Sequence, residues 1–311
     1  MTRTFNTRMV FRTMGALLLL EALFMAISMG VSLWYNEADS DVFLLSTIIT
    51  LLAGFIGIFI GRRAESRMGE REGYFIVAMV WVVFSLFGML PYYLSGQVPS
   101  FTDAWFETMS GFTTTGATII PDLDSITHGL LFWRSLTQWI GGMGIIVLSI
   151  AILPIFGLNG MQLYAAEVTG LTYEKLSPRI SDTAKLMWTT YIVLTAIEIL
   201  ALWLCGMELF DAICHSFSTI ATGGFSTKNE SLAFYDSAAI HYIVTFFMFM
   251  SGVNFVLLIY LLRGKTRNII KDEELRWYTS AVILFTLIIT IGLYVSRTGW
   301  TLTQMERSFR D

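Results

Sequence analysis

Two short segments rich in threonine and glycine carry the residue types best suited to chemistry in this sequence. One reads Gly-Phe-Thr-Thr-Thr-Gly-Ala-Thr from Gly111 to Thr118, and the other reads Ile-Ala-Thr-Gly-Gly-Phe from Ile220 to Phe225. Loops of this composition leave backbone carbonyls without internal hydrogen bonds, and such carbonyls can replace the hydration shell of a desolvated monovalent cation. Glycine permits the torsions that turn successive oxygens inward. The threonine hydroxyls either bind the ion as further ligands or brace the loop.

The segments that position these loops are short, and each carries an Asp-Ala pair near its start. Phe101–Ile120 and Leu209–Thr227 are too short or too polar to span a bilayer, so we expect each to enter the membrane as a helix and turn back. The helix dipole would then place partial negative charge beside the ion. Asp103 and Asp211 are predicted to cap the starts of these helices. A Thr-Gly pair closes both segments, with one residue less in the second.

Long apolar runs make up most of the remaining chain. Hydrophobic residues form 55% of the 311 residues and charged residues only 14%, against roughly 25% charged residues in soluble domains. A run of about 20 apolar residues crosses roughly 30 Å of hydrocarbon. The predicted fold class is therefore an all-α integral membrane protein. The predicted spans are Val10–Trp34, Val42–Gly61, Tyr74–Leu94, His128–Leu153, Ala184–Leu204, Ala238–Leu262 and Trp277–Val295.

The distribution of lysine and arginine predicts how the chain crosses the membrane. If the N-terminus is cytoplasmic and both short segments re-enter from outside, 15 of the 20 basic residues fall on the inner side. Basic residues are enriched in cytoplasmic loops. A full crossing by either short segment would move the later basic loops to the outer side. The re-entrant interpretation is therefore preferred, and the N-terminus is expected in the cytoplasm.

The arrangement of helix, re-entrant pore loop and helix occurs twice, after an extra helix pair. The predicted units are a leading two-helix transmembrane segment over 1–72, pore repeat 1 over 73–155, a cytoplasmic linker over 156–183, pore repeat 2 over 184–264, and the start of repeat 3 over 265–311. The third repeat is inferred because Ser308–Asp311 resembles Ser100–Asp103. On this interpretation the sequence is a truncated fragment of a longer chain.

Composition and spacing give no support to several other classes of protein. A net charge of −4 provides no strongly basic surface, so no nucleic-acid partner is expected. Cys205 and Cys214 are expected to be buried free thiols. The three histidines have no metal-ligand spacing with one another or with either cysteine. No Ser–His pair, paired acid or metal cluster stands out, so neither an enzyme nor a cofactor is expected.

Charged residues within or near the predicted spans are further candidates. Glu21 and Glu198 could be functional because acids inside a membrane are costly. Both could instead pair with hydroxyl or backbone groups between helices. Arg134 lies near the end of its span, where its side chain could extend to the interface. Pairing of Arg134 with Glu107 on the first short helix is the alternative.

These motifs resemble the Trk/Ktr potassium uptake family, and within it the TrkH-type membrane subunit. The resemblance rests on the two Thr/Gly loops, on Arg134 with Gln138–Gly144, and on Pro178–Ala184. The leading pair of spans fits the TrkH-type branch, which has an extra helix pair. The resemblance covers essentially the whole chain.

The resemblance implies potassium uptake through a pore formed by four repeats of one chain in the bacterial cytoplasmic (inner) membrane. The implied partners, besides the lipid bilayer, are a second copy in a homodimer and a cytoplasmic nucleotide-binding regulatory subunit (TrkA-like). Family filters bind potassium through backbone carbonyls. The matching residues here are Thr114, Thr115, Gly116, Ala221, Thr222 and Gly223, flanked by Thr113, Ala117, Ile220 and Gly224.

The identity of the ion follows from the same resemblance. A glycine in the first filter is associated with potassium, so Gly116 favours potassium. The alternative is a secondary transporter of another monovalent cation, sodium. Beyond the start of repeat 3, the third and fourth repeats have no counterpart in this sequence, so this polypeptide alone is not expected to conduct.

Overall fold

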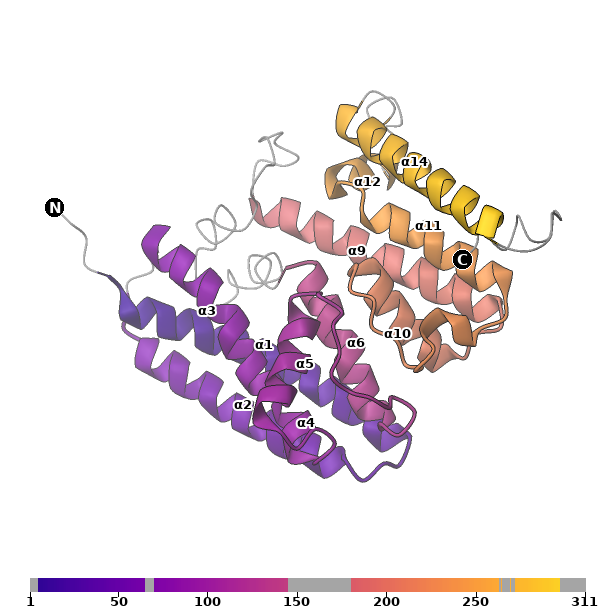
Figure 1. The fold of residues 1–311 in the computed structure, drawn as a ribbon. Helices are drawn as coiled ribbons and strands as arrows, with labels where there is room; N and C mark the ends of the chain where they lie inside the picture. Colours follow the sequence, from indigo (N-terminus) through magenta and orange to yellow (C-terminus); the bar gives the residue numbers. More distant parts are fainter. Residues whose placement is uncertain are drawn as a thin grey trace.

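The computed structural model describes residues 5–64, 70–144, 180–262, 264, 269 and 272–296, and within these residues it contains helices and no strand (Figure 1). Five of the described helical segments are long and apolar enough to cross a membrane. The prediction of an all-α membrane protein is therefore confirmed. The elements are α1 (Thr7–Trp34), α2 (Ser40–Gly61), α3 (Glu70–Gly88), α4 (Leu90–Leu94), α5 (Phe101–Phe112), α6 (His128–Gly142), α9 (Ile180–Leu204), α10 (Leu209–Ile220), the 3-10 helix η2 (Ser231–Phe234), α11 (Ala238–Ser251), α12 (Phe255–Leu262) and α14 (Glu273–Ser296).

Helices α1 and α2 form an antiparallel pair along one side of the molecule (Figure 1). Glycines on α2 allow the close approach, because a Cβ atom added to Gly57 would lie 2.9 Å from the carbonyl oxygen of Phe11. A Cβ atom added to Gly15 on α1 would lie 2.6 Å from the carbonyl oxygen of Gly54. Small residues at helix interfaces are the usual means of packing helices in lipid.

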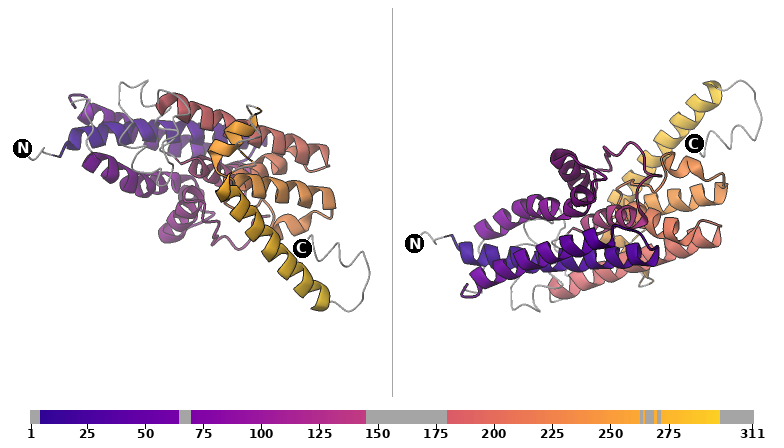
Figure 2. Two further views of the ribbon diagram at one scale, coloured as in Figure 1. Left: turned by 90° about the horizontal axis from the view of Figure 1, so that it is seen from above. Right: turned by 90° about the horizontal axis from the view of Figure 1, so that it is seen from below.

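Helix α6 lies at the centre of the described structure. It packs against α1, against α5 and against α10, and α9 covers the other side of α10. The two short helices that precede the Thr/Gly loops therefore share one neighbour. Helix α14 leans away from the other helices (Figure 2), and its apolar side chains are exposed, with Phe285 at 62% and Val295 at 65%.

One of the predicted spans is interrupted in the structure. The prediction of one helix over Ala238–Leu262 is wrong, because α11 ends at Ser251 and α12 begins at Phe255. The Tyr278 hydroxyl of α14 donates a hydrogen bond of 3.2 Å to the Phe249 carbonyl. In an unbroken helix that carbonyl would accept from the amide of Val253, which bonds to Met250 instead.

The predicted span Tyr74–Leu94 is confirmed as one span over Arg71–Leu94, in which only Met89 separates α3 from α4. Pro91 follows the interruption at Met89, and a proline has no amide hydrogen to donate to the preceding turn. The end of the predicted span His128–Leu153, most of the predicted linker 156–183 and the terminal residues 297–311 lie outside the described residues.

Candidate ion-binding site

The two Thr/Gly segments adopt the same backbone conformation. We call Thr113–Ala117, after α5, loop 1 and Ala221–Phe225, after α10, loop 2. Thr114 has a φ of +53° and Thr222 a φ of +55°, both in the left-handed region. Gly116 and Gly224 follow with φ values of +77° and +83°. A β-branched residue rarely adopts a positive φ, so the repetition of this geometry identifies the two loops as structural equivalents.

Matching hydrogen bonds end the two short helices. The amide of Thr115 donates to the Ser110 carbonyl at 3.0 Å, and the amide of Gly223 donates to the Ser218 carbonyl at 2.8 Å. These are the six-to-one bonds of a Schellman motif. The threonine in the left-handed position turns the chain sharply, so the backbone after it leaves the helix axis as an extended segment.

The structure corrects the alignment of the two loops that the closing Thr-Gly pairs predict. In the structure every equivalent residue is separated by 108 positions, so Thr115 corresponds to Gly223 and Gly116 to Gly224. Ala221 is the counterpart of Thr113. The closing Thr-Gly pairs were a misleading guide because loop 2 has two consecutive glycines, Gly223 and Gly224. Only Gly224 has the positive φ that Gly116 has in loop 1.

The predicted N-caps are also corrected. The N-cap of α5 is Ser100, whose hydroxyl accepts a hydrogen bond from the amide of Asp103 at 3.4 Å. The N-cap of α10 is Glu208, and Asp211 lies within the first turn. Both aspartates therefore lie one turn later than predicted, where an acidic side chain still interacts favourably with the positive end of the helix dipole.

Loop 1 and loop 2 meet at their glycines. A Cβ atom added to Gly116 would overlap the carbonyl oxygen of Gly223. Since the two residues come from different repeats, the tertiary structure brings the predicted ion-binding segments side by side. Loop 1 is partly exposed and presents Thr113 and Thr115 to the surface, whereas Gly223 is buried.

Hydroxyl groups hold loop 1 from within. The Thr113 hydroxyl donates to the Met109 carbonyl at 2.7 Å and lies 2.8 Å from the Thr115 hydroxyl. The Ser110 hydroxyl donates to the Ala117 carbonyl at 2.6 Å. The Ala117 carbonyl is thereby engaged by the helix behind it. Of the two roles considered for the threonines, these bonds support bracing of the loop by Thr113.

Gln138 of α6 lies behind both loops. Its side-chain oxygen accepts a hydrogen bond from the amide of Phe225 at 3.1 Å. A Cβ atom added to Gly223 would lie 2.6 Å from its amide nitrogen. That nitrogen is buried and has no hydrogen-bond partner among the described residues. Gln138 therefore fixes the course of loop 2 and carries a donor that remains available at the junction of the loops.

Arg134, one turn earlier on α6, links α5 to the end of loop 2. The side chain is 2% exposed, and its Nε lies 2.7 Å from the carboxylate of Glu107 on α5. Its Nη1 donates to the Ser226 carbonyl at 2.8 Å, and its guanidinium carbon lies 3.6 Å from the centre of the Phe225 ring. Glu107 also accepts from the amide of Ile119 at 2.9 Å. Of the two alternatives for Arg134, the ion pair with Glu107 is confirmed.

Small residues on α6 receive the ends of both short helices. A Cβ atom added to Gly141 would overlap the Phe112 carbonyl at the end of α5. One added to Gly142 would lie 2.5 Å from the Cα atom of Ala221 at the end of α10. Gly141 and Gly142 therefore provide close packing. They share a face of α6 with Arg134 and Gln138, because residues separated by three, four or seven positions lie on one side of a helix.

Beyond the loops, polar side chains connect the two chain segments. Asn229 accepts a hydrogen bond from the amide of Leu123 at 2.7 Å. Its side-chain nitrogen donates to Asp122 and to Asp124, both at 2.9 Å. Asp211 accepts hydrogen bonds of 2.6 Å from the hydroxyls of Thr227 and Tyr235, and its carboxylate lies 3.4 Å from the Lys228 ammonium nitrogen.

Comparison with known proteins identifies the family. A family model described as a cation transport protein, TrkH, matches residues 39–306. The chain belongs to the TrkH family. It is 43% identical over 291 residues to the Trk system potassium uptake protein TrkH of Salmonella typhimurium, covering 92% of this chain and 60% of that protein. It is 36% identical over 300 residues to the Trk system potassium uptake protein TrkG of Escherichia coli, covering 94% of this chain and 62% of that protein.

A solved member of the TrkH family has a closely similar structure. The crystal structure of the potassium transporter TrkH from Vibrio parahaemolyticus superimposes with a TM-score of 0.83 at 37% identity, covering 98% of this chain and 62% of that one. The present chain thus spans about three-fifths of the length of these relatives.

The remaining candidates of this TrkH family chain lie away from the loops. Glu21 is buried beside Gly88, and Glu198 is buried beside Thr219 of α10. Both cysteines are free thiols, as predicted, but only Cys214 is buried, and Cys205 is partly exposed. No group of three or more His, Cys, Asp or Glu side chains in the described part of the chain could hold a metal ion. The residue pattern alone predicted no role for the Gln138 or Asn229 side chain. The helical spacing of Arg134, Gln138 and Gly142 was the available signal.

Proposed function

We propose that this chain supplies two of the loops that form a potassium-selective filter. The observation that carries the proposal is the convergence of loop 1 and loop 2, which share one backbone conformation and meet at Gly116 and Gly223. Their carbonyls would take the place of the hydration shell of the ion. The proposed ligands remain the residues matched to the family filter: Thr114, Thr115, Gly116, Ala221, Thr222 and Gly223. The 108-residue equivalence adds Gly224 at the position of Gly116.

Potassium is the proposed cargo, and uptake the proposed direction. The relatives described above are named for potassium uptake, which supports potassium over sodium. The chain covers about 60% of their length, so the activity belongs to the whole protein that contains this segment. Passage of an ion through such a filter forms and breaks no covalent bond. We accordingly propose a transporter without catalytic activity or a bound cofactor.

The proposed setting is a bacterial cytoplasmic membrane, with the N-terminus inside. Support comes from Arg8, Arg62 and Arg63, which lie exposed at one end of the α1–α2 pair, whereas Glu37 and Asp41 lie at the other end. Basic residues favour the cytoplasmic side. The family resemblance supports a homodimer and a nucleotide-binding regulatory subunit of the TrkA type as partners.

Growth of an uptake-deficient bacterium at low potassium tests the proposal. The strain would carry the full-length gene that contains this segment, either unchanged or with Gly116→Asp or Gly223→Asp. Rescue by the unchanged gene but not by the variants is expected, because an aspartate side chain would fill the junction of the loops. Equal rescue by all three, with equal protein in the membrane, would show that the loops do not form the filter. If the unchanged protein takes up sodium and not potassium, sodium is the transported ion.

A further inference from the structure

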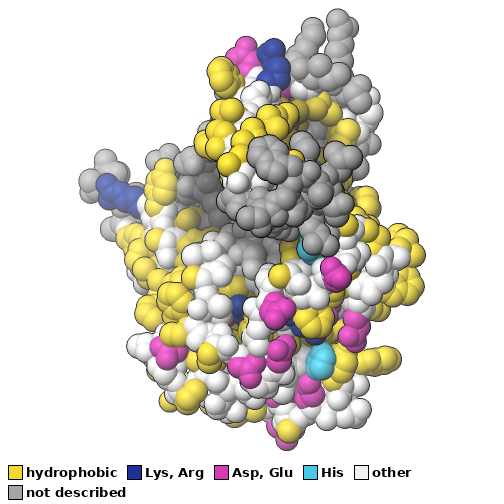
Figure 3. All heavy atoms as spheres, turned by 45° about the vertical axis from the view of Figure 1, so that its right-hand side comes forward, with side chains coloured by type: hydrophobic (Ala, Val, Ile, Leu, Met, Phe, Trp, Pro, Cys, Tyr) yellow, Lys and Arg dark blue, Asp and Glu magenta, His cyan; other side chains and the backbone are white. Residues whose placement is uncertain are grey.

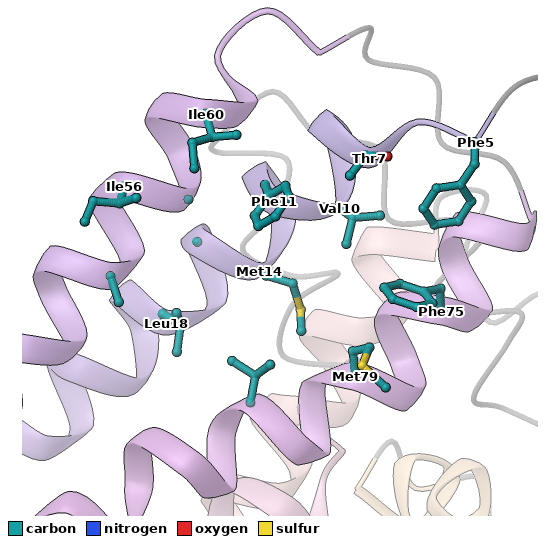
Figure 4. Close-up of a pocket in the computed structure, with 14 residues that line it drawn as sticks. Phe5, Thr7, Val10, Phe11, Met14, Leu18, Ile56, Ile60, Phe75 and Met79 are labelled. Carbon is teal, nitrogen blue, oxygen red and sulfur yellow. The ribbon is translucent and has the colours of Figure 1, made fainter.

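An apolar groove opens between α1, α2 and α3, well away from the loops. Its volume is about 510 Å³, within the range of roughly 300–1,000 Å³ found for ligand-binding pockets. Figure 4 shows side chains from the three helices around it. The lining is apolar apart from Thr7, and it includes Phe11, Met14, Ile56, Phe75 and Met79.

Part of the lining of the groove is exposed on the surface of the described helices. Five of its large apolar lining side chains remain exposed, among them Phe11 at 44%, Ile56 at 59% and Phe75 at 44%. On a helix pair that crosses a membrane, this surface faces hydrocarbon. A flexible alkyl chain fits such an elongated apolar groove, because it can follow the gap between helices without an unpaired polar group.

Positive charge lies at one end of the same groove. A Cβ atom added to Gly61 would lie 2.6 Å from the Arg8 carbonyl oxygen, which places the end of α2 beside the start of α1. Arg8 follows the lining residue Thr7, and Arg62 and Arg63 follow the lining residue Ile60. The three arginine side chains are exposed, and the Arg62 guanidinium lies 4.4 Å from the centre of the Phe59 ring.

We propose that this groove binds one anionic phospholipid. An acyl chain lies in the groove and the phosphate contacts the guanidinium groups of Arg8, Arg62 and Arg63. Arginine suits this role because its planar donors pair with phosphate oxygens in a bidentate manner. Basic pockets between membrane helices on the cytoplasmic side bind anionic headgroups. The proposal concerns the leading helix pair and does not depend on the identity of the transported ion.

Lipid retention by the purified full-length protein tests the proposal. The protein would be delipidated in detergent and mixed with phosphatidylglycerol or with phosphatidylcholine of the same acyl chains. Native mass spectrometry would then count the bound lipids. We expect one phosphatidylglycerol to be retained in preference to phosphatidylcholine. Met79→Trp, which fills the groove, should abolish this retention. The double variant Arg62→Gln/Arg63→Gln should lower the preference for phosphatidylglycerol by about thirtyfold.

Two matched variants separate this site from general contact with lipid. Leu52→Trp enlarges an exposed side chain of α2 that does not line the groove, and Arg276→Gln removes an exposed charge on α14. Both should retain phosphatidylglycerol like the unchanged protein. Equal retention of the two lipids by the unchanged protein, or unchanged retention by the double arginine variant, would overturn the proposal. Because Arg62 and Arg63 are exposed, the second outcome is decisive even if Met79→Trp does not fold.

Discussion

Backbone strain is concentrated at single residues of the two loops. Thr114 and Thr222 hold left-handed conformations, and such conformations cost of order 1–3 kcal/mol for a residue with a Cβ atom. The Schellman hydrogen bonds after each short helix and the side chains of α6 offset this cost. The strain serves to turn the chain so that the following carbonyls leave the helix. Glycine then becomes necessary where one loop touches the other.

Substitution of Gly116 by alanine should separate steric contact from backbone strain. We expect Gly116→Ala to lower the initial rate of potassium uptake by more than tenfold, because the added methyl group would overlap the Gly223 carbonyl. Gly96→Ala is the matched control. Gly96 has a φ of +72°, close to the +77° of Gly116, but a Cβ atom there would meet no atom within 4 Å. Equal loss in both variants would attribute the effect to strain alone.

Removal of Arg134 should leave a carboxylate buried without its charge partner. For Arg134→Gln we expect a loss of about 3–5 kcal/mol in the free energy of unfolding, as for other broken buried pairs. Thermal unfolding of the purified protein would measure it. The double variant Arg134→Gln/Glu107→Gln should recover part of the loss, because neither side chain is then charged. If the double variant is no more stable than the single one, the ion pair is not the cause.

Helix α6 is the element that organises the site. One face of it carries Arg134 and Gln138, which bind the loops, and Gly141 and Gly142, which receive the ends of α5 and α10. The positions of the two loops therefore depend on a single helix.

A change at Gly141 should displace loop 1 without touching it directly. We expect Gly141→Ala to reduce potassium uptake and to lower the melting temperature, because the methyl group would overlap the Phe112 carbonyl, which is backbone and cannot rotate away. Gly30→Ala in α1 is the control. A Cβ atom added to Gly30 would meet no atom within 4 Å. Gly30→Ala should leave the melting temperature unchanged or raise it slightly, because alanine favours a helix by about 1 kcal/mol over glycine.

The connection beyond the loops should weaken in acid. The hydrogen bond from Asn229 is the chief reason that the pKa of Asp122 lies below its ordinary value of 3.8. A lowered pKa stabilises the folded state above the ordinary value, and this contribution is lost as the pH falls through the lowered pKa. The protection factor of the Leu123 amide in hydrogen exchange should therefore fall as the pH is lowered below about 3.8. In Asp122→Asn this acid-dependent step should be absent, and a step of the same size in that variant would refute the assignment.

At the scale of the whole molecule, polar contacts join the leading helix pair to the rest of the described structure. Several acidic side chains are scattered over the lower part of the face seen in Figure 3. At this end the loop between α1 and α2 is bonded to the start of α6. Glu37 accepts hydrogen bonds from the amides of His128 and Gly129 at 2.9 and 3.1 Å, and Asp39 accepts from the Thr127 hydroxyl at 2.6 Å. The leading helix pair is thereby joined to the helix that organises the loops.

Loss of this connection should be measurable as a change in stability. Glu37→Ala removes the acceptor for two free amides at the start of α6, and substitutions of helix caps cost about 1 kcal/mol. A decrease of a few degrees in melting temperature is expected. Glu230→Ala, at an exposed acid with no side-chain cap bond, should leave the melting temperature unchanged. A similar decrease for both would indicate a general effect of charge.

The sequence by itself determined the membrane class, five of the seven predicted spans and the two Thr/Gly loops. These follow from the length of apolar runs and from local composition, both of which act over about 20 residues or fewer. The helix character of α5 and α10 and their ends near Phe112 and Ile220 were predictable for the same reason.

Only the tertiary structure decided the features that depend on residues far apart in the chain. The interruption after Ser251 involves Tyr278 of another helix. The Arg134 side chain forms an ion pair and does not extend to the membrane interface, because Glu107 and the Ser226 carbonyl bind it. The Asp-Ala pairs align the two segments at a spacing of 108 positions and the closing Thr-Gly pairs at 107, and the backbone torsions decided for 108. Long-range packing supplies these constraints, and neither spacing nor composition encodes them locally.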